Sequence, residues 1–106
     1  MSELKEDLYL KAASLFADGK VDEAIGEFQK ALGLDPLFYD ALQGLGMAYF
    51  QKGMLDEAIE VGKKMVETNP DDVLAHTSLS MFYQRKGMIP EAEAEGNKAR
   101  ALGLKK

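Results

Sequence analysis

The stretch that decides the fold is residues 45–70, LGMAYFQKGMLDEAIEVGKKMVETNP, near the middle of the 106-residue chain. Apolar residues recur at helical spacing up to Gln51, and Gly53 then interrupts the pattern. A glycine just past a helix end can adopt the left-handed conformation that closes a helix. A second helical segment follows, with Asp56 as its cap or first-turn acid, and Pro70 ends it because proline cannot continue a helix. The stretch therefore predicts two helices joined by a tight turn.

The same pattern occurs three times along the chain. Residues that recur with a spacing of 34 are Gly19, Gly53 and Gly87; Glu23, Glu57 and Glu91; Ala24, Ala58 and Ala92; and Lys30, Lys64 and Lys98. This register divides the chain into units 5–38, 39–72 and 73–106, which predicts six helices in three hairpins. One hairpin cannot bury its apolar side alone, so we expect the three to stack into a single domain over residues 1–106.

With this period and these positions, the chain resembles the tetratricopeptide repeat family. The closest match is unit two, where Leu45 and Gly46 are followed by Tyr49, Ala58 and Pro70. The resemblance covers residues 5–106. It implies an all-α, right-handed α-solenoid of three helix-turn-helix hairpins, whose first helices line a concave groove. It also implies a protein-interaction module that holds a peptide or protein segment in that groove.

The chain departs from the family pattern at one position in the second helix of each hairpin. Four residues after the signature alanine the family carries a large aromatic residue, but only Phe28 keeps it, and Gly62 and Gly96 replace it. Met65 stands where the family prefers alanine, so a flexible methionine could fill the space that Gly62 leaves. Glycine inside a helix costs about 1 kcal/mol relative to alanine. We therefore expect close backbone approach at these glycines; the alternative is locally loose packing.

The resemblance places nine side chains on the groove side of the first helices. They are Tyr9, Ala13, Phe16, Gln43, Met47, Phe50, Thr77, Met81 and Gln84. This surface is apolar and partly methionine, which suits an extended or helical peptide with apolar anchors. For Phe16, Met47, Phe50 and Met81 the alternative is packing inside the stack, whereas Leu8, Leu42 and Leu45 are expected in the core.

Two uses of the family can be compared with these residues. Some members grip the carboxyl terminus of chaperones with lysine, asparagine and arginine at set groove positions. The matching positions here carry Tyr9, Ala13, Gly44, Leu74 and Ser78. None of these side chains donates the charge-assisted hydrogen bonds that a carboxylate needs, so we expect no such clamp. The small bacterial secretion chaperones, with three repeats and an apolar groove, are the closer resemblance.

Charge is distributed unevenly along the chain. Residues 5–38 hold four lysines and seven acidic residues, a net charge of −3. Residues 39–72 hold three lysines and seven acidic residues, a net charge of −4. Residues 73–106 hold six basic residues and three glutamates, a net charge of +3. The alternative function is therefore a scaffold, a homo-oligomer in which Arg100, Lys105 and Lys106 dock head to tail on an acidic end of another molecule. Alternatively, the charges of the last helix simply cap the stack, or the chain is one part of a larger protein.

Composition argues against several other classes of function. The formal net charge of −5 disfavours binding to nucleic acid. The chain has no cysteine and a single histidine, His76, which we expect to fill space between repeats, so no metal or cofactor is predicted. No nucleophile motif or phosphate-binding loop is present, which predicts that the protein is not an enzyme. The chain contains no run of about 18 apolar residues, so no membrane partner is predicted. The lack of a signal-peptide pattern favours the cytoplasm.

Overall fold

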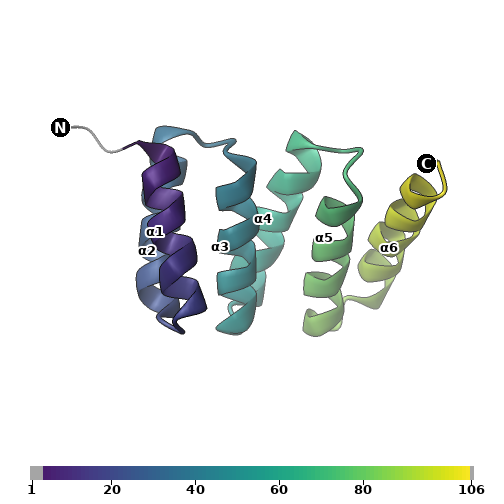
Figure 1. Ribbon diagram of the computed structural model, residues 1–106. Helices are drawn as coiled ribbons and strands as arrows, with labels where there is room; N and C mark the ends of the chain where they lie inside the picture. The colour runs from purple at the N-terminus through teal and green to yellow at the C-terminus, as the bar shows by residue number, and fades with distance from the viewer. Residues whose placement is uncertain (1–3, 106) are drawn as a thin grey trace.

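The computed structural model describes residues 4–105, which form six α-helices and no strand (Figure 1). The helices are α1 (Lys5–Ala17), α2 (Val21–Leu34), α3 (Tyr39–Gln51), α4 (Leu55–Thr68), α5 (Val73–Lys86) and α6 (Ile89–Gly103). Each repeat contributes two consecutive helices that pack against each other as a hairpin. The predicted all-α fold of six helices in three hairpins is confirmed.

The turn inside each hairpin depends on a glycine. Gly19, Gly53 and Gly87 have φ angles of 82°, 77° and 87°, in the left-handed region that favours glycine. After Gly53, the backbone N–H of Met54 donates to the carbonyl oxygen of Tyr49 at 2.9 Å, and the corresponding bond recurs in the other two hairpins. This arrangement satisfies carbonyl groups at the end of the helix, and it confirms the left-handed glycine predicted from the sequence.

The first turns of α2 and α4 show whether Asp22 and Asp56 act as helix caps or as first-turn acids. The residues that cap α2 and α4 are Lys20 and Met54, and neither side chain makes a capping hydrogen bond. Asp22 and Asp56 lie inside the first turn, where a carboxylate interacts favourably with the positive end of the helix dipole. They are first-turn acids and not caps.

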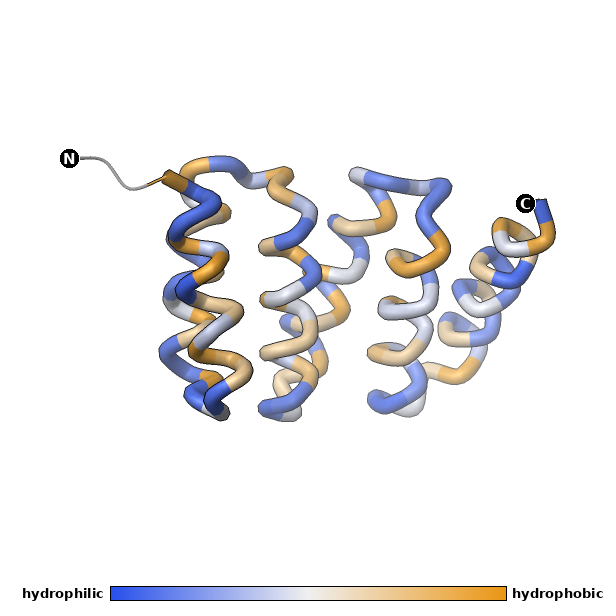
Figure 2. The backbone as a smooth tube through the Cα atoms, in the orientation of Figure 1, coloured by the Kyte–Doolittle hydropathy of each residue, from blue (hydrophilic) through white to orange (hydrophobic). Residues whose placement is uncertain are grey.

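The helices form two layers (Figure 1). The first helices of the hairpins, α1, α3 and α5, lie side by side in one layer, and α2, α4 and α6 lie in the other. The stack is elongated, with principal extents of 45, 28 and 20 Å. Hydrophobic residues recur on every helix between hydrophilic ones (Figure 2), as expected for helices that bury one side against their neighbours.

The buried residues form two clusters. One lies mainly in the first two repeats and contains Leu8, Leu42 and Leu45, the three leucines that are expected in the core. The other joins the second and third repeats around Phe82. Met65 is 1% exposed and belongs to the first cluster. Met65 therefore fills space in the core, but the atoms nearest to the space at Gly62 belong to Leu79 and Phe82, so the prediction that methionine fills that space is wrong.

The two interfaces between repeats take their large aromatic side chain from different helices. In the first interface it is Phe28 of α2, and in the second it is Phe82 of α5. A Cβ at Gly62 would lie 2.9 Å from Cδ1 of Leu79 and 3.3 Å from Cδ2 of Phe82. The expected close approach is therefore present at Gly62, where side chains of α5 occupy the space of the missing aromatic residue.

The same expectation is wrong at Gly96. A Cβ added there would meet only the Oγ atom of Ser80, at an ordinary contact distance of 3.4 Å. Gly62 is crowded because α5 packs on that side of α4. Within residues 4–105, no helix packs on the corresponding side of α6.

Candidate functional site

The nine side chains predicted for the groove all come from the layer of α1, α3 and α5. Seven of them are half-buried, and Thr77 and Gln84 are exposed. None is fully buried, although the Phe16, Met47, Phe50 and Met81 side chains also pack against the core clusters. These four residues therefore combine the two roles that the sequence left open: part of each side chain supports the stack and part is accessible.

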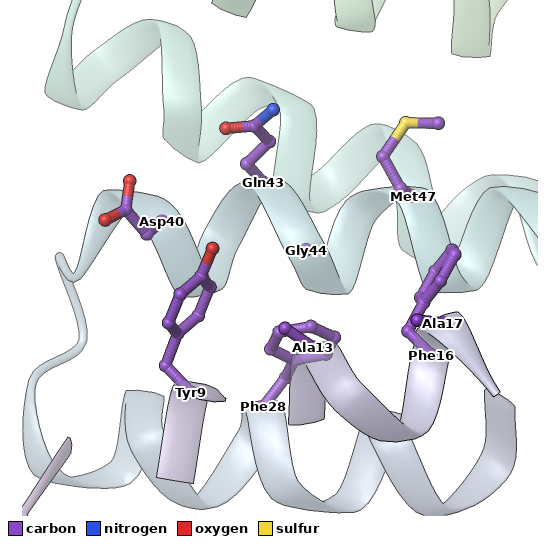
Figure 3. A pocket seen from close by; sticks show the side chains of 9 residues that line it. All are labelled: Tyr9, Ala13, Phe16, Ala17, Phe28, Asp40, Gln43, Gly44 and Met47. Atoms are coloured by element: carbon purple, nitrogen blue, oxygen red, sulfur yellow. The ribbon is translucent and has the colours of Figure 1, made fainter. Parts of the chain in front are cut away.

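The deepest part of this surface is a cavity of about 250 Å³ between α1 and α3 (Figure 3). In Figure 3, Asp40, Gln43 and Met47 of α3 lie along one side, and Tyr9, Ala13 and Phe16 of α1 lie along the other. Five of the nine predicted side chains line it: Tyr9, Ala13, Phe16, Gln43 and Met47. Most of the lining is apolar, so the cavity can accept a large apolar side chain.

The cavity also contains groups that the sequence prediction missed. Phe28 of α2 reaches the cavity beside Gly44 of α3, and Ala17 and Asp40 complete the lining. The space for the Phe28 ring exists only because Gly44 has no side chain, since a Cβ there would lie 2.4 Å from the ring atoms Cε1 and Cζ. The pairing of Gly44 with Phe28 has no local signal in the sequence.

The accessible apolar surface continues from this cavity toward α5. Phe16 and Met47 also line a second cavity with Phe50, Gln51 and Arg85. Phe50 and Arg85 line a third cavity with Met81 and Gln84. We call the surface lined by these three cavities the groove. Eight of the nine predicted side chains line it, and Thr77 does not.

Arg85 is another groove residue that the sequence did not indicate. Its guanidinium carbon lies 4.6 Å from the centre of the Phe50 ring, within the range of a cation–π interaction. The Phe50 ring is itself 5.4 Å from the centre of the buried Phe82 ring. Arg85 is therefore held against the groove by an aromatic side chain that is anchored in the core.

The positions of the carboxylate clamp carry no charged donor. Tyr9, Ala13 and Gly44 line the apolar cavity. Leu74 is exposed, and Ser78 is buried in the stack with 5% exposure. The local chemistry therefore gives a carboxylate no strong partner at these five positions.

The residues proposed for self-assembly lie near the other end of the stack. Arg100 and Lys105 are exposed, and Lys106 lies outside the described residues. Arg100 borders a cavity of about 260 Å³ that is formed by α5 and α6, and its lining includes Ala92 and Gly96. The corresponding place on α4, beside Gly62, is filled by Leu79 and Phe82 of α5.

The N-terminal end of a second copy, stacked in the repeat register, would not fill this cavity as α5 fills the corresponding space at Gly62. At the positions of Leu79 and Phe82, α1 carries Lys11 and Ser14, and both residues are exposed. A second copy stacked in the repeat register would bring these polar side chains to the cavity at Gly96. The geometry gives such a copy no large apolar residue to insert.

Ion pairs between repeats follow the 34-residue period as well. Lys52 pairs with Asp22 at 2.5 Å, and Lys86 pairs with Asp56 one period later. In the first repeat the position of Lys52 is occupied by Asp18, and in the third repeat the position of Asp56 is occupied by Pro90. Two stacked copies would therefore juxtapose an aspartate and a proline in place of this ion pair.

The single histidine is part of the packing between helices. His76 is 4% exposed, its Nε2 lies 2.6 Å from the carbonyl oxygen of Pro70, and its Nδ1 lies 2.6 Å from Oε2 of Glu95. Because a carbonyl oxygen only accepts hydrogen bonds, Nε2 is the donor to Pro70. The imidazole thus links α5 to α6 and to the preceding loop, in agreement with the predicted structural role.

Neither a cluster of metal-binding side chains nor a membrane-spanning helix is found in the described part of the chain. Among residues 4–105, no group of three or more histidine, aspartate and glutamate side chains converges to hold a metal ion. No helix in the same range is both long and apolar enough to cross a bilayer.

Comparison with known proteins identifies the repeats. A family model described as tetratricopeptide repeat matches residues 15–81. A crystal structure of MamA superposes on 96% of the chain with a TM-score of 0.92 and 29% sequence identity. The chain spans 60% of the length of that MamA structure. Comparison with curated protein sequences gave no match.

Two further structures have similar architecture. The type III secretion translocator chaperone SycD of Yersinia enterocolitica, in an alternative dimer, is 25% identical with a TM-score of 0.88; the match covers 96% of this chain and 77% of SycD. The first repeat domain of Spaghetti (RPAP3), bound to an HSP90 peptide, has a TM-score of 0.89 over 96% of this chain and 81% of its own length. At 22% identity, the latter similarity shows the fold alone.

Proposed function

Because the chain belongs to the tetratricopeptide repeat family, we propose that it is a non-catalytic interaction module that binds a peptide or protein segment in its groove. The observation that carries this proposal is the cavity between α1 and α3, with a mostly apolar lining that stays accessible to solvent. Burying apolar surface of this kind is the main favourable term in protein association. Burial of the apolar groove lining would therefore favour the binding of a partner.

The partner is proposed to be a segment with apolar anchor residues. SycD is described as a secretion translocator chaperone, and a chaperone-like role for this chain is consistent with its accessible methionine and aromatic side chains. RPAP3 is described as bound to an HSP90 peptide. The clamp positions of this chain hold no charged donor, so we do not extend that ligand to it.

The proposal can be tested with Met47→Lys, which places a charge between the first two cavities of the groove. We would titrate isotope-labelled protein with the peptide acetyl-Gln-Ser-Phe-Ser-Gln-amide and follow backbone resonances. Resonances of groove residues should shift in the unaltered protein and no longer shift in Met47→Lys. Leu10→Lys is the matched control, because Leu10 is 62% exposed on α1 and does not line the groove.

A result in which the unaltered protein and Met47→Lys respond equally would contradict binding in the groove. A loss of binding in Leu10→Lys as well would show that the effect is general and not local. Circular dichroism of each variant establishes that the helices remain formed.

The second candidate, self-assembly through the C-terminal end, has one observation in its favour. The cavity beside Gly96 has the position that α5 fills on the preceding repeat. The polar residues Lys11 and Ser14 at the other end disfavour stacking in the repeat register. Light scattering at low and high salt tests this candidate: a mass that grows with protein concentration and falls with salt would support charge-driven assembly.

A further inference from the structure

The groove contains two charged side chains, and they lie at different ends of it. Asp40 lines the cavity between α1 and α3, and Arg85 lines the two cavities between α3 and α5. The other lining residues are apolar, glycine, tyrosine or glutamine. Charged residues make up 29% of the chain, so they are scarce in the groove. An acidic side chain lies at one end of the groove and a basic side chain at the other, with an apolar surface between them.

Both charges are available to a ligand. Within residues 4–105, neither Asp40 nor Arg85 forms an ion pair, and both are exposed. Stacking on Phe50 fixes one surface of the Arg85 guanidinium. The N–H groups at the edge of a stacked guanidinium remain free to donate to a carboxylate. Asp40 can accept hydrogen bonds from a basic side chain in the same way.

The separation of the two charges sets the length of a matching ligand. Asp40 and Gln51 both lie on α3, and eleven helical residues correspond to roughly 16 Å along the axis. Gln51 and Arg85 line the same cavity. An extended chain rises about 3.3 Å per residue, so about five residues span this distance. In such a chain, alternate side chains point to the same side.

We propose that the groove selects an extended segment of five residues with a basic side chain at one end, a large apolar side chain in the middle and an acidic side chain at the other end. This inference rests on the proposed function and specifies its ligand. The basic residue pairs with Asp40, the apolar residue enters the cavity beside Phe28 and Gly44, and the acidic residue pairs with Arg85. The three matching side chains alternate with residues that face solvent.

The charges act mainly on selectivity. An exposed ion pair adds little free energy, because water and salt screen it and the side chains lose freedom. The apolar anchor therefore supplies most of the affinity, and each matched charge is expected to improve binding about threefold at low salt. The improvement should fade as salt is raised.

The test uses four peptides with a common Ser-Phe-Ser centre, acetylated and amidated. Their outer residues are Arg and Glu, Gln and Gln, Arg and Arg, or Glu and Glu. Dissociation constants are measured by nuclear magnetic resonance titration. The Arg and Glu peptide should bind the unaltered protein most tightly. Asp40→Arg should prefer the peptide with two glutamates, and Arg85→Glu should prefer the peptide with two arginines.

Matched controls separate this effect from the net charge of the protein. Glu67→Arg and Lys64→Glu make the same changes of charge on α4, where both residues are exposed and outside the groove. They should keep the peptide order of the unaltered protein. If they change the order as much as the groove variants do, long-range attraction explains the preference and the inference is wrong.

The outcomes distinguish this inference from the proposed function. If all four peptides shift groove resonances with equal affinity in every variant, apolar binding stands and charge selection is wrong. If no peptide shifts groove resonances, or if the shifts lie at the Gly96 cavity, the proposed function fails and the inference fails with it.

Discussion

The Cβ atom that an alanine would add at Gly44 would lie 2.4 Å from Cε1 of Phe28, inside the space that the ring occupies. Phe28 is 2% exposed and is among the largest fully buried side chains of the chain. The ring therefore has little room to move, and this contact between α2 and α3 limits the cavity between α1 and α3.

Gly44→Ala should consequently destabilise the protein, by about 1–3 kcal/mol, because overpacking forces the Phe28 ring out of position. Chemical denaturation measures the change. Gly26→Ala is the matched control: it lies on α2, nothing stands within 4 Å of its added Cβ, and it should stabilise the helix by about 0.5–1 kcal/mol. Equal gains in both variants would mean that the contact with Phe28 does not constrain position 44.

The same substitution should have opposite effects at the two glycines that replace the family's aromatic residue. Gly62→Ala brings a methyl group to 2.9 Å from Leu79 and should destabilise the interface by about 1–2 kcal/mol. Gly96→Ala meets only Ser80 at 3.4 Å, so the better helix propensity of alanine should add up to about 1 kcal/mol. Thermal unfolding of the two variants checks the contrast; a stabilised Gly62→Ala would show that α5 can shift away freely.

His76→Leu should cost about 2–3 kcal/mol, because it leaves Oε2 of Glu95 and the carbonyl oxygen of Pro70 without their partner. The corresponding positions in repeat two carry Leu42 and Val61, both buried in the core. His76→Leu combined with Glu95→Val should therefore recover most of the lost stability, since apolar residues can replace a buried polar pair. Urea denaturation of the single and double variants gives both values. A double variant no more stable than His76→Leu would contradict this account.

Because of Tyr39, the stability of the protein should depend on pH in the alkaline range. Its side chain is half-buried and its O–H donates to Oδ2 of Asp72 at 2.6 Å. Burial, and then the hydrogen bond to Asp72, raise the pKa of Tyr39 above its ordinary value of about 10. The neutral phenol is thus favoured in the folded protein, and its contribution is fully present below about pH 10 and is lost as the pH rises further.

Tyr39→Phe should therefore be less stable than the unaltered protein by about 1 kcal/mol at neutral pH, with a smaller difference above about pH 10. Denaturation curves of both proteins between pH 7 and pH 11 measure this difference. A constant difference across that range would mean that ionisation of Tyr39 is not linked to folding.

Much of the site was predicted from position in the repeat. Eight of the nine proposed side chains line the groove, because residues three, four or seven apart on a helix share one side. Their role in binding remains a prediction. Asp40, Phe28 and Arg85 were missed, since their place in the groove depends on which helices meet. The periodic pattern gives no information on the distance between Arg85 and Phe50, or between Phe28 and Gly44.

The sequence by itself determined the six helices, their turns and the register of the three repeats. These features depend on local interactions: apolar spacing, glycines with positive φ and prolines after helix ends. Only the tertiary structure decided that Phe28 supplies the aromatic side chain of one interface and Phe82 that of the other. It also decided that Gly62 is crowded while Gly96 borders a cavity. Both glycines occupy the same position in the repeat, so the difference arises from the helix that packs against each of them.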